Sequence, residues 1–259
     1  MTKIIFVFFK GLIITSLLMF FSSCNSETKE PLRIAVASNL RYTLEELNAE
    51  FEKKTDFKVE MSVASSGKLT AQIQNGAPFD IFLSANKKYP QFLFKNGFSV
   101  EKPKLFCSGL LVYWTNKELN LKGDIFELKS TNIQRIAIAN PKIAPFGMAT
   151  IDALKSISIY DSVKTKIIYA ENVSQISQYV LNNNVDVGFT GKSIVLSPKL
   201  KNKGKWFDVD ENLYNQIEQY VLLLKRAEQQ ESAQEYYEFL FSKEAKRIFK
   251  KYGYKNIDF

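Results

Sequence analysis

The sequence contains no histidine and only two cysteines among its 259 residues. Histidine is the most common general base and the most common zinc ligand in proteins. Its absence excludes a Ser-His-Asp triad, a histidine-containing zinc site and an HExxH metalloprotease. The nucleotide-binding patterns GxxxxGK[ST] and GxGxxG are missing as well. These absences favour a binding protein over the enzymes that depend on such groups.

A basic start, an apolar run and two serines precede Cys24. This order predicts a secretory signal peptide over residues 1–23 and a lipid attached to Cys24, with residues 24–31 as a short tether. Because Phe21 stands where a lipobox usually has leucine, plain cleavage and an uncleaved anchor remain alternatives. We therefore expect an exported protein, periplasmic or held in the cell envelope. With Cys24 lipidated, Cys107 is alone and no disulfide can form within the chain.

The positive charge of the chain does not indicate a nucleic-acid partner. The formal net charge is +8, and removal of a leader that holds Lys3, Lys10 and no acidic residue lowers it to +6. The lysines are scattered, apart from a run over 199–205 that we interpret as a solvated loop. An exported protein also has little access to nucleic acid.

Buried-strand patterns alternate with helical patterns, which predicts an α/β fold with parallel strands. Strands are expected at 32–37, 58–64, 79–85, 135–139, 166–170 and 185–190. Long apolar runs at 105–114 and 217–224 are the candidate crossings between two lobes, and two helices are expected at the C-terminus. We therefore expect residues 32–105 plus 220–259 to form lobe 1 and residues 106–219 to form lobe 2.

Small or helix-capping residues recur at four places where a predicted strand is followed by a predicted helix, which we call corners. They are Ser38-Asn39, Ser65-Ser66-Gly67, Pro145-Phe146-Gly147 and Glu171-Asn172-Val173. A helix start leaves backbone N–H groups without intrahelical acceptors and attracts negative charge. In α/β sheets these corners lie at the carboxyl ends of strands, where ligands bind. One such corner is ordinary helix capping, but four together favour a site for an anion.

Enzymatic alternatives find little support in the residues. Ser65 to Lys68 can be aligned with an SxxK pattern, but the SDN and KTG patterns of penicillin-binding proteins do not occur. Paired carboxylates of a glycosidase are not excluded by spacing. However, Asp80, Glu101 and Asp152 stand in no distinctive context. An exported hydrolase therefore remains only an alternative, and no catalytic residue is predicted.

Several segments, in order, resemble the periplasmic molybdate-binding proteins of ABC importers. The first runs from "VASNLRYTLEELNAEFEKK" through "SVASSGKL" to "NGAPFDIFLSA", the second is "ENVSQISQYVLNNNVDVGFTGKS", and the third is the closing "EFLFSKEAKRIFKKYGY". The resemblance covers nearly all of residues 32–254. It implies a two-lobe, type II periplasmic-binding-protein fold, with mixed sheets, helices on both faces and a ligand cleft between the lobes.

The resemblance also implies a role for each corner. The residues expected to bind the oxyanion are Ser38, Ser66, Phe146, Val173 and Thr190. Residues expected beside the ligand are Asn39, Ser65, Gly67, Gly147 and Asn172. The family often has a tyrosine at the position of Thr190, whose shorter side chain can reach the ligand directly, reach it through water or only line the wall. Lys68 is expected to point to solvent.

The implied ligand is molybdate or tungstate, a tetrahedral dianion that accepts hydrogen bonds and donates none. The resemblance implies a monomer that passes the ion to a membrane permease, with no cofactor and no metal bound as a cation. A site made of donors alone disfavours protonated phosphate, which needs an acceptor, while sulfate must be excluded by size. Binding of sulfate, phosphate or another tetrahedral oxyanion remains the alternative within this class.

Overall fold

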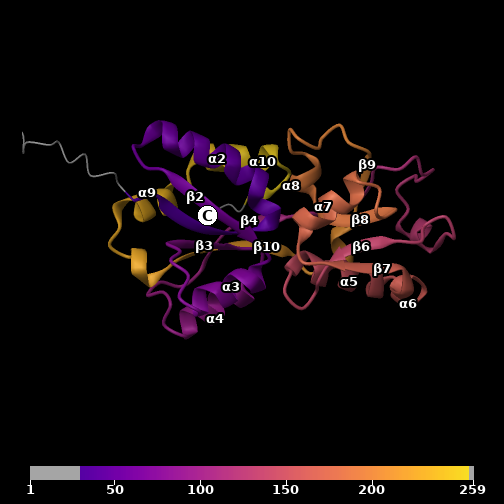
Figure 1. The fold of residues 1–259 in the computed structure, drawn as a ribbon, viewed down its shortest axis with the longest axis horizontal. Helices are drawn as coiled ribbons and strands as arrows, with labels where there is room; N and C mark the ends of the chain where they lie inside the picture. Colours follow the sequence, from indigo (N-terminus) through magenta and orange to yellow (C-terminus); the bar gives the residue numbers. More distant parts are fainter. Residues whose placement is uncertain (1–29, 257–259) are drawn as a thin grey trace, which may run out of the picture. The chain divides into compact units, whose positions relative to one another are not determined.

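Two mixed β-sheets form the framework of the protein (Figure 1). The structure is a computed structural model and describes residues 30–256. The predicted signal peptide and the predicted lipidation site at Cys24 lie outside the described residues. Within residues 30–256, no helix is both long enough and apolar enough to span a membrane.

The strands of lobe 1 hydrogen-bond in the order β11-β4-β10-β3-β1-β2, and those of lobe 2 in the order β7-β6-β8-β5-β9. The strands of lobe 1 are β1 (Leu32–Ala37), β2 (Val59–Ala64), β3 (Ile81–Ser84), β4 (Lys104–Gly109), β10 (Ile217–Leu223) and β11 (Lys255–Asn256). The strands of lobe 2 are β5 (Leu111–Thr115), β6 (Ile136–Ala139), β7 (Ile167–Ala170), β8 (Val187–Gly191) and β9 (Lys205–Asp208). Each sheet contains both parallel and antiparallel pairs.

Helices cover these sheets. The α-helices are α2 (Arg41–Lys54), α3 (Ser66–Gln74), α4 (Lys88–Lys95), α5 (Pro145–Ser156), α6 (Tyr160–Val163), α7 (Val173–Leu181), α8 (Lys192–Val195), α9 (Glu231–Phe239) and α10 (Lys243–Lys251). The 3-10 helices are η2 (Ser38–Leu40), η3 (Ile125–Lys129), η4 (Lys164–Lys166), η5 (Glu211–Leu213) and η6 (Lys225–Ala227).

The alternation of side chains along β1 places helices on both faces of the first sheet. Ile34 and Val36 belong to the large core cluster that includes Leu44 of α2. Ala35 belongs to a second cluster with Leu69 of α3. Because successive side chains of a strand point to opposite faces, α2 and α3 cover opposite sides of the sheet, as Figure 1 shows.

The C-terminal helices α9 and α10 return to lobe 1, where they lie beside α2 (Figure 1). Tyr236 of α9 is fully buried, and its hydroxyl donates a hydrogen bond of 2.5 Å to Oδ1 of Asn48 on α2. Its ring also packs edge-on against Phe51. These contacts hold α9 against α2.

The chain crosses between the sheets at Leu110 and again over residues 209–216. The predicted boundaries at 105/106 and 219/220 therefore fall inside β4 and β10. The apolar run over 105–114 holds one strand of each lobe, and its hydrophobicity is continuous because both strands are buried. Hydropathy alone thus locates the crossing but not the residue at which it happens.

Several elements lack a clear sequence pattern and were not predicted. Helix α4 contains Pro90, β9 has two adjacent aromatic residues between two charged ones, and β11 is a single pair of residues. Helix α8 has only one turn. Short or punctuated elements of this kind form because neighbouring elements hold them, which periodicity does not reveal.

Asp186 ties the second lobe together at the start of β8. Its Oδ1 pairs with Nζ of Lys117 at 2.6 Å, and its Oδ2 accepts the backbone N–H groups of Gln134 at 2.7 Å and Arg135 at 2.8 Å. Burial acts to raise the pKa of Asp186, but these hydrogen bonds and the charge of Lys117 outweigh it. The pKa of Asp186 therefore lies below its ordinary value.

We expect Asp186→Asn to lower the free energy of unfolding at pH 7 by about 2 kcal/mol, because buried donors lose a charged acceptor. A lowered pKa stabilises the fold above the ordinary aspartate pKa of 3.8, and this contribution is lost as pH falls through the folded-state value. The difference between variant and wild type should therefore shrink in acid. Urea unfolding at several pH values measures it, with the exposed Asp161→Asn as the control that changes little. An equal difference at all pH values would contradict the assignment.

Candidate functional site

The four strand-to-helix corners meet around one small cavity between the lobes. Residues from every corner line it: Ala37, Ser38, Asn39, Ser65, Ser66, Ala85, Ala144, Pro145, Phe146 and Val173. Gly67, Gly147, Asn172 and Thr190 do not line this cavity. Ala85 was missed by sequence reasoning, although its place directly after β3, at the same carboxyl edge of the sheet, is a usable signal.

At the second corner, capping and lining are done by different serines. Ser65 is the N-cap of α3, and its Oγ accepts the N–H of Lys68 at 3.4 Å. Ser66 is the first helical residue, and its Oγ accepts the N–H of Ala85 at 3.1 Å. A serine hydroxyl has one hydrogen to donate in addition to its acceptor sites. Because none of the described residues accepts a hydrogen bond from Ser66 Oγ, which acts only as an acceptor for Ala85, its hydrogen is available to an acceptor in the cavity.

The first corner offers a similar donor. Ser38 opens η2 directly after β1, and its side chain is buried. Within residues 30–256, its hydroxyl has no hydrogen-bond partner. The side-chain amide of Asn39 is not available in the same way, because it donates to Oε1 of Gln219 at 2.9 Å and to the hydroxyl of Tyr254 at 3.0 Å.

The third and fourth corners present helix starts to the same cavity. Pro145 occupies the start of α5, where a missing N–H costs no intrahelical bond. A Cβ on Gly147 would lie 2.0 Å from the carbonyl oxygen of Ala139, so only glycine lets α5 begin against the end of β6. Asn172 caps α7 by accepting the N–H groups of Ser174 at 3.0 Å and Gln175 at 3.1 Å. This capping leaves Val173 as the residue of α7 that lines the cavity.

The cavity is small and carries no formal charge. The space open to the centre of a water-sized sphere is about 10 Å³, about what one water molecule requires. None of the described residues that line it is an aspartate, glutamate, lysine or arginine. Hydroxyl groups and helix starts surround it, which suits a compact hydrogen-bond acceptor.

Direct hydrogen bonds join the two lobes beside the cavity. The N–H of Gly67, on α3, donates to the carbonyl oxygen of Ile143 in lobe 2 at 3.0 Å. The hydroxyl of Tyr89, on α4, donates to the carbonyl oxygen of Lys142 at 3.2 Å. Gly67, expected beside the ligand, therefore uses its N–H to hold the other lobe.

Lys68 does not point freely to solvent, as the sequence suggested. Its Nζ lies 3.0 Å from Oε2 of Glu171, which belongs to the fourth corner in lobe 2. Both side chains are nearly half exposed, so the ion pair contributes little to stability. Its position nevertheless makes it part of the contact between the lobes.

Thr190 lies on β8, where it pairs in register with Val112 of β5. It is fully buried, and its Oγ1 has no hydrogen-bond partner among the described residues. A buried hydroxyl without a partner costs free energy. Of the three roles left open by the sequence, lining the wall of this cavity is not supported.

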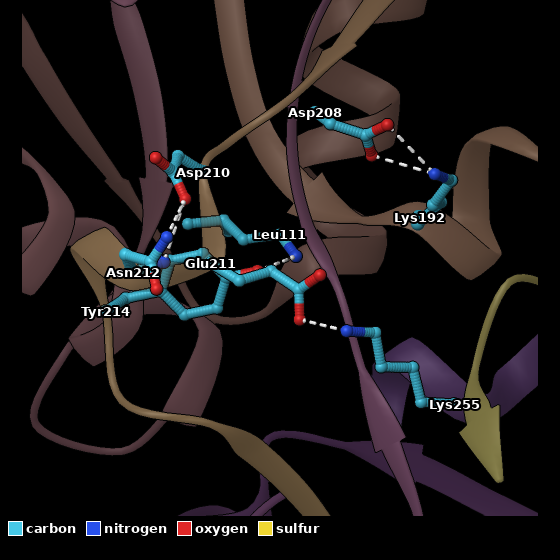
Figure 2. Close-up of polar contacts among 8 residues, drawn as sticks. All are labelled: Leu111, Lys192, Asp208, Asp210, Glu211, Asn212, Tyr214 and Lys255. Atoms are coloured by element: carbon cyan, nitrogen blue, oxygen red, sulfur yellow. Dashed lines mark hydrogen bonds and ion pairs between the residues drawn. The ribbon is translucent and has the colours of Figure 1, made fainter.

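A larger cavity of about 530 Å³ lies along the crossing segment 209–216. Its cations are already paired, as Figure 2 shows: Lys192 Nζ lies 2.9 Å from Asp208, and Lys255 Nζ lies 2.6 Å from Glu211. Its walls therefore mix both signs of charge, unlike the neutral wall of the cavity at the four corners. We take the cavity at the four corners as the candidate binding site.

Comparison with known proteins shows the family to which the chain belongs. The family model "Bacterial extracellular solute-binding protein" matches residues 32–255. The molybdate-binding protein ModA of Azotobacter vinelandii is 31% identical over 233 residues, covering 90% of this chain and 92% of that protein. ModA of Rhodobacter capsulatus is 33% identical over 221 residues, covering 85% of this chain and 86% of that protein.

A solved structure has the same fold. The periplasmic molybdate-binding protein of Azotobacter vinelandii superimposes with a TM-score of 0.83 at 30% sequence identity, covering 88% of this chain and 100% of that chain. The fold is that of the two-lobe periplasmic binding proteins, as the sequence predicted. The chain belongs to the family of bacterial extracellular solute-binding proteins, and the resemblance stated from its motifs is confirmed.

We expect Gly67→Ala to hold the lobes further apart. The added Cβ would lie 3.0 Å from Cα of Ile143 and 2.9 Å from the hydroxyl oxygen of Tyr89, closer than such atoms pack. Alanine also favours the helix by about 1 kcal/mol, so the fold itself should not weaken. Small-angle X-ray scattering should show a larger radius of gyration, while the exposed Gln72→Ala on the same helix leaves it unchanged. Identical scattering from both variants would contradict this role of Gly67.

Proposed function

We propose that this protein binds molybdate in the cavity at the four corners and delivers it to the membrane permease of an ABC importer. The observation that carries the proposal is the cavity itself, a neutral space walled by hydroxyl groups and helix starts from both lobes. Tungstate, an ion of the same charge and shape, is expected to bind as well. The ligand is cargo, so no cofactor is required.

The donors fit a fully deprotonated dianion. Ser38 and Ser66 have hydroxyl hydrogens without an assigned acceptor, and Phe146 and Val173 stand at helix starts with free N–H positions. Hydrogen bonds to an anion are short and strong where water is excluded. We assign these four residues to the oxyanion, with Asn39 and Ser65 beside it.

The size of the cavity bears on the ligand too. Space for about one water molecule excludes a sugar or another organic solute unless the lobes separate widely. A tetrahedral oxyanion needs only a small movement of the walls, which a hinge between lobes supplies. We propose that the hydroxyl of Thr190 reaches the ion through an intervening water, which would also satisfy its unpartnered oxygen.

The test is thermal unfolding of the purified protein with molybdate, tungstate, sulfate and phosphate in turn. A ligand at about 1,000 times its Kd stabilises the folded state by about 4 kcal/mol. We expect a clear rise of Tm with micromolar molybdate and tungstate, and none with sulfate or phosphate at the same concentration. A rise with sulfate or phosphate alone would transfer the function to that anion, and no rise with any of the four would refute the proposal.

Two neighbouring serines give a matched pair for the same measurement. Ser66→Ala should abolish most of the molybdate-dependent rise in Tm, and it should also lower the anion-free Tm, because the buried N–H of Ala85 loses its acceptor. Ser65→Ala removes the N-cap of α3 and should cost about 1 kcal/mol of stability while retaining the molybdate response. The reverse pattern would show that Ser66 serves the helix and not the ligand.

We further propose that the protein is anchored to the cell envelope through a lipid on Cys24. The support is the sequence order of a basic start, an apolar run and two serines before this cysteine. Cys24→Ala should move the protein from the membrane fraction to the soluble fraction of the cell envelope. Mass spectrometry of the wild-type N-terminus should show an acylated cysteine, and an unmodified N-terminus after cleavage would contradict the anchor.

A further inference from the structure

A buried polar network lies behind the first corner and crosses from one lobe to the other. Ser193, on α8 of lobe 2, donates its hydroxyl to the carbonyl oxygen of Asn39 in lobe 1 at 2.8 Å. The hydroxyl of Tyr254 lies 2.9 Å from the same carbonyl oxygen and 3.0 Å from Oγ of Ser193. Gln219, on β10, accepts from the Asn39 amide at 2.9 Å. All four side chains are buried.

Tyr254 holds the centre of this network. Its hydroxyl accepts one hydrogen bond from the Asn39 amide at 3.0 Å, and its single hydrogen goes to Asn39 or Ser193. Burial raises the pKa of Tyr254 far above its ordinary value, so the hydroxyl keeps that hydrogen at any physiological pH. The network therefore fixes both the side chain and the backbone carbonyl of Asn39, the residue next to Ser38.

The C-terminal segment that carries Tyr254 sits against the crossing between the lobes. A Cβ on Gly253 would meet the side chains of Leu196 and Lys192 of lobe 2 at 2.9 and 3.1 Å. Lys255 pairs with Glu211 in the crossing segment at 2.6 Å (Figure 2). Three successive residues of lobe 1 thus contact lobe 2 or the connection to it.

Phe146 reaches the same place from the third corner. A Cβ on Gly109, directly before the crossing at Leu110, would lie 3.1 Å from the ring of Phe146 and 3.5 Å from the ring of Tyr254. A Cβ on Gly191 would lie 3.1 Å from the Phe146 ring as well. Phe146 lines the anion cavity, and its ring also packs against the crossing, close to Tyr254.

We propose that Tyr254, together with Ser193, is a positioning residue for the oxyanion site. The two hydroxyls set the first corner against lobe 2, so that Ser38 meets the donors of Phe146 and Val173 at the spacing of one small ion. This inference rests on the proposed function and adds residues that lie outside the cavity wall. Because the contact crosses between lobes, it contributes to the arrangement in which the anion is held.

The test compares two buried tyrosines in calorimetric titrations with molybdate. Tyr254→Phe should weaken molybdate binding about tenfold, the effect of one hydrogen bond of about 1.4 kcal/mol. Tyr236→Phe is the matched control, because it also removes a buried hydroxyl bonded to an asparagine, but within lobe 1. Both variants should lose stability, and only the first should lose affinity. Titrations are made well below both melting temperatures.

Serines supply a second matched pair. Ser193→Ala should weaken molybdate binding by a similar factor, whereas Ser197→Ala, whose hydroxyl bonds to Ile194 in its own segment at 2.7 Å, should not. The double variant Ser193→Ala with Tyr254→Phe should lose less affinity than the product of the single losses, since both act on one contact.

The outcomes separate this inference from the proposed function. If the wild type binds molybdate and Tyr254→Phe binds it as tightly as Tyr236→Phe does, the positioning role is refuted and the function stands. Fully multiplicative losses in the double variant would also refute a shared contact. A wild type that binds none of the four anions refutes the proposed function, and the positioning role falls with it.

Discussion

The first N–H groups of a helix have no acceptor within the helix and must find one elsewhere, and this chain gathers four such helix starts around one cavity. β1 ends at η2, β2 ends at α3, and the loops after β6 and β7 lead into α5 and α7. Parallel strands bring these starts to the same edge of each sheet. An anion placed between them would complete hydrogen bonds that the fold alone leaves open.

Closure in this protein also has contacts of its own. Gly67 donates to Ile143 across the cleft, and Ser193 donates to Asn39 behind it. The bond of Ser193 with Asn39 is buried, whereas the ion pair of Lys68 with Glu171 is exposed and weak. The hydrogen bonds of Gly67 and Ser193 therefore help to fix how the lobes meet. A site with such preformed contacts needs less of the ligand's binding energy for ordering.

Sequence reasoning found three of the four corners because they are marked by residues that local physics demands. The Ser38-Asn39 corner has the residue types of a cap, but no side chain caps η2 or α2 there. Ser65 and Asn172 cap helices, Pro145 opens one, and Gly147 is required where a Cβ would strike Ala139. The sequence could not show which serine of a corner caps the helix and which one faces the cavity. That distinction depends on the hydrogen bond of Ser66 with Ala85, which directly follows β3.

The features of the site and of the lobe crossing that the sequence did not reveal also depend on long-range contacts. Lys68 is exposed, but its ion pair with Glu171 of lobe 2 could not be predicted from the sequence, and the crossing at Leu110 is hidden within one apolar run. The Tyr254 network joins residues separated by 215 and 61 positions in the chain, and no local pattern marks it. Resemblance to a family identifies whole segments of the sequence. The role of each residue within a segment becomes clear only from its contacts in the folded protein.

The uncharged wall of the cavity at the four corners bears on which anions can bind there. A lysine or arginine in the cavity would attract any anion, including protonated phosphate. Hydroxyl and N–H donors of fixed direction bind well only to a ligand whose oxygens all accept hydrogen bonds. A carboxylate, which could accept the proton of phosphate, is also absent from the described cavity wall. Charge thus excludes little here, and selection between ions of equal charge must come from the spacing of the donors. In our proposal the contacts between the lobes set that spacing, which makes Tyr254, outside the cavity, a positioning residue for the site.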